Sequence, residues 1–474
     1  MDASCLFKTL LATNWALFLW DQYITWRQYK VHRDAEKRPE EVKELINDED
    51  YKKARDYKID NHLFGFLHSW FNQALLTAQL IGGYYPFLWY ATASYPLHIA
   101  VFLSINSIIE TVIDLPWDLY STFIIEESHG FNKQTIGFFF VDKVKKMLVG
   151  FVITMPIVYA IEWIVVNGGP YFFVYIWLFV SVVVLLLMTI YPSFIAPLFD
   201  KYFPLPDGDL KSKIEQLAAS LNYPLTKLYV VNGSKRSAHS NAYMYGFWKN
   251  KRIVLYDTLL SGMEKEKVHK LYVEAGEKIE ENDNDKKRGM SNDEVVAVLG
   301  HELGHWALWH TLINLIITEV NLFFMFSVFA YFYKYDALYR AFGYTDTPPI
   351  IGMMLIFQFV LALYNQLAGM GMVIHSRSAE FGADEFAANL GHGDNLIGAL
   401  TKLGVDNLSM PINDELYSWC THTHPPVVER VAARSARMVV EGWSVYWCAR
   451  WTDPRPQSVF TSSRTKRWES ETED

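Results

Sequence analysis

His301-Glu302-Leu303-Gly304-His305 stands directly before a long apolar run at 311–333. Two histidines four residues apart lie on one face of a helix, one turn from each other, so their ring nitrogens can meet on a single Zn²⁺ ion. Glu302 is placed to take a proton from a water that the ion activates for attack on a peptide carbonyl. The pattern therefore predicts a hydrolytic zinc site. The alternative is an exposed helix that happens to carry two histidines.

The residues in front of this motif predict the helix that it needs. Ser291-Asn292-Asp293-Glu294 has the S-x-x-E pattern of a capping box, and the apolar residues Val295 and Val296 follow. We therefore expect a helix that begins near Asn292 and carries the motif about two turns in.

Composition narrows the class of protein. Of the 474 residues, 51% are apolar and 20% are charged, and the apolar ones gather in blocks too long for ordinary core helices. The net charge of −9 is spread over segments of mixed sign, so nothing indicates a nucleic acid partner. Only three cysteines occur (Cys5, Cys420 and Cys448), which argues against a disulfide framework and against a cysteine zinc site.

The apolar blocks predict an integral membrane protein in a lipid bilayer, with about seven transmembrane helices. The first block is not followed by a small-residue cleavage site, so we interpret it as an anchor and not as a signal peptide. The alternative is that one or two of the weaker blocks are buried core helices. The clearest spans are 147–166, 171–191, 311–333 and 349–373, and the weaker ones are 6–26, 70–90 and 96–116.

Loop charge predicts the orientation. Segment 27–61 holds ten Lys/Arg and segment 117–146 holds four, whereas loops 91–95 and 167–170 hold none. Positive residues favour the cytosol, so the N-terminus is expected on the far, lumenal side. The zinc helix and the chain after residue 373 would then share the cytosolic side.

The predicted domains follow from the spans. Residues 1–197 hold the first five spans, 198–310 form a soluble insertion that ends in the zinc helix, and 311–373 hold the last two spans. Residues 374–451 form a C-terminal segment of the same enzyme domain, and the polar tail 452–474 is expected to be disordered.

Within the soluble insertion we expect a small β element beside helices. The pattern predicts a helix at 209–221, strands at 228–231 and 253–256, and a turn at 249–251. The highly charged stretch 264–290 is expected to be a disordered loop.

Polar residues inside the predicted spans indicate a water-filled interior. Asn106, Glu110 and Asp114 recur at four-residue spacing and share one helix face. The alternative is hydrogen bonding between helices of a dry bundle. Further polar residues of this kind are Glu162, Glu319, Asn321, Gln358, Asn365 and Gln366.

A candidate for the third zinc ligand lies downstream of the two histidines. In Glu380-Phe381-Gly382-Ala383-Asp384 the two acidic residues lie one helical turn apart. Two histidines and a glutamate form a catalytic zinc site with one position left for water, and Asp384 is placed to brace a histidine or an arginine. The alternative is that both residues belong to a solvated helix face.

Several segments in a fixed order carry a family resemblance; they are 114–120, 123–132, 195–201, 233–243, 298–306 and 424–430. By these segments the chain resembles the CAAX prenyl protease 1 family of zinc metalloproteases over nearly its whole length. The shorter bacterial heat-shock relatives have fewer spans and fit less well.

The resemblance implies a set of site residues. It implies Glu380 as the third zinc ligand, an ion pair between Arg430 and Asp384, and Asn241 and His424 beside the scissile bond. His424 is our candidate donor to the oxyanion of the transition state, with Asn241 holding the substrate backbone. A residue bulkier than Gly382 is more usual in the family at that position.

The resemblance also implies the fold and the function. It implies transmembrane helices that enclose a wet chamber, joined to a zincin-like metalloprotease domain, with one Zn²⁺ per chain. The expected reaction is removal of the C-terminal tripeptide of prenylated, typically farnesylated, CAAX proteins, and in some members a second upstream cut. The expected location is the endoplasmic reticulum membrane, with the inner nuclear membrane as a second site.

Two other functions stay open. A general membrane protease that clears misfolded or translocon-stalled proteins would use the same chemistry. A transporter or channel with structural histidines would explain the polar residues within the spans. Glu302 argues against transport, which has no use for a base beside the histidines.

Overall fold

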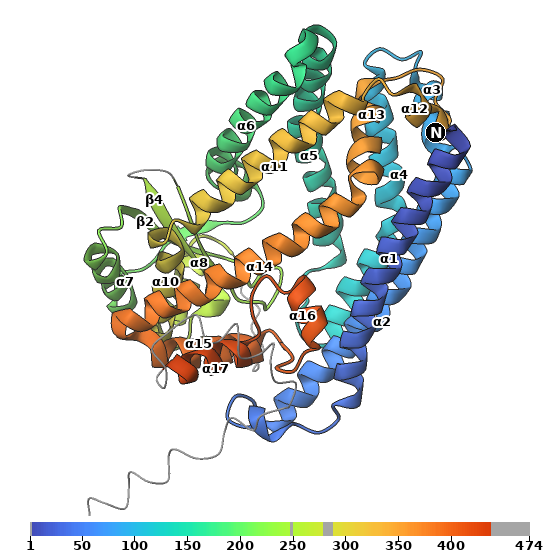
Figure 1. The fold of residues 1–474 in the computed structure, drawn as a ribbon. Helices are drawn as coiled ribbons and strands as arrows, with labels where there is room; N and C mark the ends of the chain where they lie inside the picture. The colour runs from blue at the N-terminus through green and yellow to red at the C-terminus, as the bar shows by residue number, and fades with distance from the viewer. Residues whose placement is uncertain (1, 247–249, 278–287, 438–474) are drawn as a thin grey trace, which may run out of the picture.

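The structure is a computed structural model that describes residues 2–246, 250–277 and 288–437. Long helices lean over a small sheet (Figure 1). The N-terminus lies at the end of the molecule where α3 (Tyr84–Thr92), α12 (Asp336–Ala341) and α13 (Pro349–Leu355) gather. At the opposite end lie α10 (Asn292–Ala307), α15 (Gly393–Asp406) and α17 (Val427–Arg437).

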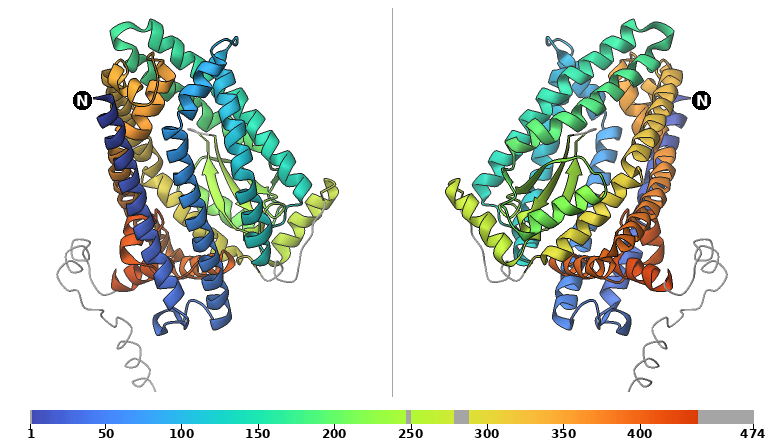
Figure 2. Two further views of the ribbon diagram at one scale, coloured as in Figure 1. Left: turned by 90° about the vertical axis from the view of Figure 1, so that its right-hand side faces the viewer. Right: turned by 90° about the vertical axis from the view of Figure 1, so that its left-hand side faces the viewer.

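The N-terminal half consists of six helices that run back and forth along the long axis of the molecule (Figures 1 and 2). Proline occurs inside two of these helices, Pro116 in α4 and Pro156 in α5. Their bounds are α1 Ala3–Asp34, α2 Asp48–Ile81, α3 Tyr84–Thr92, α4 His98–Tyr120, α5 Ile136–Asn167 and α6 Phe172–Ile190.

Helices that are long and apolar enough to cross a membrane confirm the membrane class. Within the described residues there are four of these, or five when one bent pair is taken as a single span. They are His98–Glu126, Ile136–Asn167, Gly169–Leu198, His310–Phe332 and the pair Pro349–Val360 with Ala362–Asp406.

Two of the predicted spans differ in shape from the expectation. The span 70–90 is not continuous, because α2 ends at Ile81 and Gly83 adopts φ +66° before α3 begins. The span 349–373 is bent by 64° where a π-helical turn, Ile356–Val360, ends at Leu361. The span 6–26 lies inside α1, which is long but carries too many polar residues to pass as an apolar span.

Polar side chains of the membrane helices make hydrogen bonds across helix pairs. Asp114 of α4 lies 3.5 Å from His68 of α2, and Asn106 accepts from Tyr84 of α3 at 3.2 Å. Gln366 of α14 donates to Asp21 of α1 at 3.0 Å. At these positions the polar side chains bond to neighbouring helices, as the alternative of a dry bundle predicts. The water-filled interior stays a prediction.

The soluble insertion contains a four-stranded sheet in the order β1-β2-β4-β3. Strands β2 and β4 are parallel, and β3 and β1 are antiparallel edges. Both predicted strands exist and are longer than expected, whereas β1 was missed. The predicted turn 249–251 falls partly outside the described residues. The bounds are β1 Tyr202–Pro204, β2 Leu225–Val231, β3 Ala242–Tyr245 and β4 Lys251–Tyr256.

The core of this domain joins the sheet to helices on both sides. The predicted helix at 209–221 is α7, Asp209–Ser220, which buries Leu210 and Ile214 against Val230 and Leu255. Because Leu299 and Leu303 belong to the same core, the zinc motif is packed directly onto the sheet domain.

The prediction of a disordered loop at 264–290 is wrong in its first part. Residues Gly262–Glu274 form helix α8. Val268 and Tyr272 lie one turn apart and are 0% and 1% exposed, so an apolar stripe hidden among charges holds the helix on the core. Residues 278–287 lie outside the described residues.

In the C-terminal half the metal helix α10 is followed by the apolar helices α11, α13 and α14, and then by α15, α16 and α17. The predicted tail 452–474 lies outside the described residues. The bounds are α10 Asn292–Ala307, α11 His310–Phe332, α12 Asp336–Ala341, α13 Pro349–Leu355, α14 Ala362–Ala387, α15 Gly393–Asp406, α16 Glu415–Thr421 and α17 Val427–Arg437.

Candidate metal centre

Helix α10 carries the two histidines, and it begins where the capping box predicts. The Ser291 side chain accepts from the Glu294 backbone N–H, and the Glu294 carboxylate accepts from the Ser291 backbone N–H. The cap satisfies donors that a helix start leaves unpaired. His301 and His305 then fall on one face, two turns in.

Gly304 lets a second helix approach this face. A Cβ atom added at Gly304 would lie 3.2 Å from both the Cα and the carbonyl oxygen of Ala383 in α14. Glycine therefore allows the backbones of α10 and α14 to touch. This close contact brings Glu380 of α14 opposite the histidines, and sequence reasoning had assigned no role to Gly304.

The spacing of the three candidate ligands fits a tetrahedral metal ion. The Nε2 atoms of His301 and His305 are 3.2 Å apart, and each lies 3.4 Å from an oxygen of Glu380. Metal–ligand bonds of about 2.0–2.2 Å at tetrahedral angles put neighbouring ligand atoms about 3.3–3.6 Å apart. Glu380 is 3% exposed, and its Oε2 lies 3.4 Å from Nε2 of His301 and 3.5 Å from Nη1 of Arg430. A buried carboxylate that faces two histidine nitrogens is suited to bind a metal ion.

Protons compete with a metal ion for the histidine nitrogens of this centre. Burial alone would lower the pKa of His301, but hydrogen bonds with Asp384 and Glu380 outweigh burial and raise that pKa to about 9. Ligand histidines must be neutral to bind a metal, so metal binding at neutral pH would release a proton here.

Glu302 lies beside the ligands without being one of them. Burial raises the pKa of its carboxyl, while the neighbouring His301 and His305 oppose that rise. A carboxylate with a raised pKa is a better proton acceptor near neutral pH. The arrangement suits the role of a general base.

Asp384 and Arg430 form the ion pair that the resemblance implied. Arg430 donates through Nε to Asp384 at 2.7 Å and through Nη2 to its other oxygen. Asp384 in turn lies 2.9 Å from Nδ1 of His301. The pair therefore fixes the ring of His301 from the side away from the metal position.

His424 and Asn241 are placed differently. His424 lies 2.9 Å from Glu380 through Nδ1, and its side chain is 71% exposed. Asn241 stands directly before the edge strand β3, which packs against α10, and its side-chain oxygen accepts from the N–H of Ala242. The structure thus brings His424 into contact with the centre and leaves Asn241 at its border.

Helix α1 holds the segment that leads to His424. Arg27 donates to both carboxylate oxygens of Asp414 at 3.0–3.1 Å. Gln28 accepts from the backbone N–H of Asp414 and donates to Asn413, both at 2.6 Å. Sequence reasoning missed this grip, because a cation at the end of an apolar span carries no sign of its distant partner.

Arg377 holds the same segment from the other side. It is 4% exposed, donates to Ser418 and Glu429, and lies over the ring of Trp419. Arg377 lies three residues before Glu380 and so on the same helix face. This spacing could have predicted from the sequence that Arg377 lies near the metal centre.

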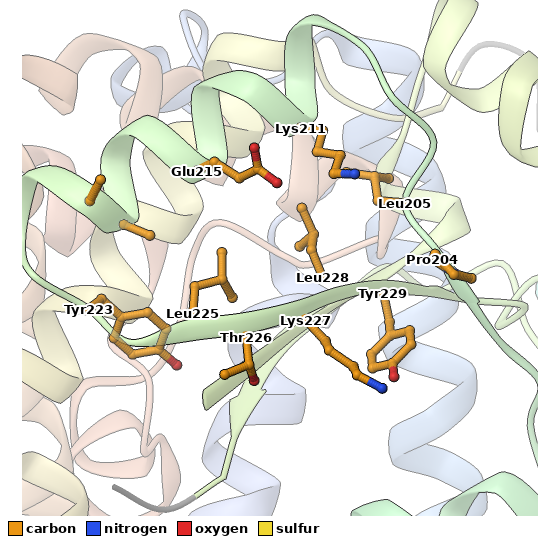
Figure 3. A pocket seen from close by; sticks show the side chains of 12 residues that line it. Pro204, Leu205, Lys211, Glu215, Tyr223, Leu225, Thr226, Lys227, Leu228 and Tyr229 are labelled. Carbon is orange, nitrogen blue, oxygen red and sulfur yellow. The ribbon is translucent and has the colours of Figure 1, made fainter. Parts of the chain in front are cut away.

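A cavity of about 500 Å³ lies apart from this centre, between α7 and β2 (Figure 3). Leu225 and Leu228 of β2 point towards α7, which carries Lys211 and Glu215, whereas Thr226 and Lys227 lie on the far side of the strand. None of the residues assigned to the metal centre lines this cavity.

Known proteins resemble the chain over most of its length. Residues 28–201 match the family model described as CAAX prenyl protease N-terminal, five membrane helices, and residues 204–438 match peptidase family M48. The chain is 90% identical over 433 residues to a CAAX prenyl protease 1 homolog of Caenorhabditis elegans, which covers 91% of this chain and 98% of that protein. It is 43% identical to the Homo sapiens homolog over 90% of this chain and 95% of that protein.

A solved structure has the same fold. The crystal structure of S. mikatae Ste24p superposes with a TM-score of 0.81 at 33% identity, covering 91% of this chain and 99% of that one. These matches confirm the resemblance drawn from the sequence. The chain is a membrane metallopeptidase and belongs to the CAAX prenyl protease 1 family.

Proposed function

We propose that this chain is a zinc-dependent endopeptidase that removes the C-terminal tripeptide of prenylated CAAX proteins, with a second upstream cut in some substrates. The observation that carries the proposal is the tetrahedral spacing of His301, His305 and Glu380 with Glu302 beside them. The names of the similar proteins supply the substrate class.

The chemistry follows from the residues around the centre. Zinc, when held by His301, His305 and Glu380, supplies a Lewis acid that makes water acidic and polarises the scissile carbonyl. Glu302 accepts the proton of the attacking water and passes it to the leaving amine. In the described part of the chain β3 is an edge strand, to which an extended peptide could add by backbone hydrogen bonds, and Asn241 stands directly before that strand.

Cleavage of a farnesylated CAAX peptide by the purified protein tests the proposal. We expect release of the tripeptide, loss of cleavage with a chelator, and recovery when zinc is added back. The same peptide without its farnesyl group is the control. Equal cleavage of both peptides, or of unfolded membrane proteins alone, would favour the quality-control alternative.

His424 is proposed to donate a hydrogen bond to the developing oxyanion. Hydrogen bonding with Glu380 raises the pKa of His424, which favours its charged, donating form. Loss of one such donor typically costs about 10²–10³ in rate. His424→Ala should therefore keep zinc and KM but lose about that much in kcat, whereas Asn241→Ala should mainly raise KM.

The melting temperature separates a donor role of His424 from a purely structural role in packing its loop. Because the His424 side chain is 71% exposed, its removal should leave the melting temperature unchanged. His422→Ala is the matched control, since His422 contacts Ser418 and not Glu380. A lowered melting temperature with normal kcat in His424→Ala would show that the residue only packs its loop.

We further propose that the enzyme lies in the endoplasmic reticulum membrane with its metal centre facing the cytosol. The distance of the N-terminus from α10 along the long helices supports opposite sides for the two (Figure 1). Tags inserted within 278–287 and at the C-terminus should be accessible in intact microsomes. A tag at the N-terminus should become accessible only after detergent, and the reverse pattern would overturn the orientation.

A further inference from the structure

The second candidate ligand, His305, has a histidine partner on the side away from the metal position. Nε2 of His305 faces Nε2 of His301 at 3.2 Å, and Nδ1 of His305 lies 2.9 Å from Nδ1 of His310. The two rings are inclined by 66°. His305 thus bridges the metal position and His310, and His310 is not itself placed as a ligand.

The protons of this contact follow from the ligand role. A histidine that binds a metal through Nε2 carries its remaining proton on Nδ1. His305 then donates from Nδ1, and Nδ1 of His310 accepts. Metal-bound histidines usually donate in this way to a carboxylate, a carbonyl or water. Here His301 contacts the carboxylate of Asp384, whereas His305 contacts an imidazole.

The backbone is bent to make this contact. Trp309, between the end of α10 and the start of α11, has φ +62° and ψ +19°. This left-handed conformation is uncommon for a bulky residue, and such strain gathers at functional sites. It ends the metal helix and turns the first residue of the membrane helix, His310, back towards His305.

Space for the ring is left by the neighbouring helix. A Cβ atom added at Gly382 of α14 would lie 3.7 Å from Cε1 and 3.9 Å from Nε2 of His310. A residue much larger than alanine at this position would press on the ring of His310. Position 382 therefore lies in direct contact range of the His310 ring.

We propose that His310 is a positioning residue for the metal: it accepts the Nδ1 proton of His305 and so fixes the tautomer and the direction of that ligand. The proposal rests on the zinc-dependent function above. It makes the first residue of the membrane helix α11 a support of the metal centre.

Zinc affinity of purified full-length variants, measured by competition with a chelator, tests this role. His310→Ala and His310→Leu lack the acceptor, and Leu keeps much of the ring's volume, so that a failure to fold is guarded against. Loss of such a partner typically weakens metal binding 10–100-fold. His310→Asn offers an amide oxygen and should restore affinity to within a few-fold of wild type.

His375→Ala is the matched control, because this nearby histidine contacts Asn314 and not a ligand. It should bind zinc like the wild type. Wild-type affinity in folded His310→Ala or His310→Leu would overturn the proposal, as would equal weakening in His310→Asn. A wild-type protein that binds no zinc would instead overturn the proposed function.

Discussion

Glu302→Gln should give a folded, zinc-loaded protein that turns over at least 10²–10⁴ times more slowly than the wild type. Glutamine keeps the shape of the side chain and leaves His301, His305 and Glu380 in place, but it cannot accept the proton of the attacking water. The raised pKa of the Glu302 carboxyl suits that acceptance and has no counterpart in an amide. Zinc content, melting temperature and kcat for the farnesylated peptide are the measurements.

Asp293→Asn is the control for this exchange. It makes the same change from carboxylate to amide on the first turn of the same helix, where the side chain is 61% exposed. It should leave kcat close to wild type. Near-normal kcat in Glu302→Gln would require another base, and no other carboxylate is proposed for that role.

His305→Ala should lose metal and activity together. The three candidate ligand atoms lie within 4.8 Å of one another, and removal of one leaves two protein ligands where a catalytic zinc site has three. The bound metal should fall from about one ion per chain to close to none, and cleavage should fall with it to background. His375→Ala should keep both. Full zinc occupancy in His305→Ala would refute the ligand assignment.

The metal helix was predictable because its signals are local. Ser291 and Glu294 cap the helix, and His301 and His305 follow within four turns, so spacing alone fixes their common face. Glu380 was identified with help from the family resemblance, because nothing local distinguishes it from a solvated acidic residue. Its approach depends on Gly304, whose role appears only when α14 is in place.

Other misses have different physical causes. Helix α8 was hidden because its charged residues outnumber its buried stripe of Val268 and Tyr272. The break at Gly83 and the bend at Leu361 were not predicted. A hydropathy pattern gives the length of an apolar stretch, but not the direction of the helix axis. The contact of His310 with His305 depends on one unusual backbone angle at Trp309, which no composition predicts.

The hydrogen bonds between Arg27 and Asp414 can form only late in the synthesis of the chain. The two residues are 387 positions apart in the chain. A ribosome that adds about 5–20 residues per second needs roughly 20–80 s to pass from one to the other. α10 itself is completed only late in that interval, and His424 and Arg430 are made after it has ended. The nascent enzyme is therefore incomplete while its helices enter the bilayer, and it gains its full catalytic set only when almost the whole chain has been translated.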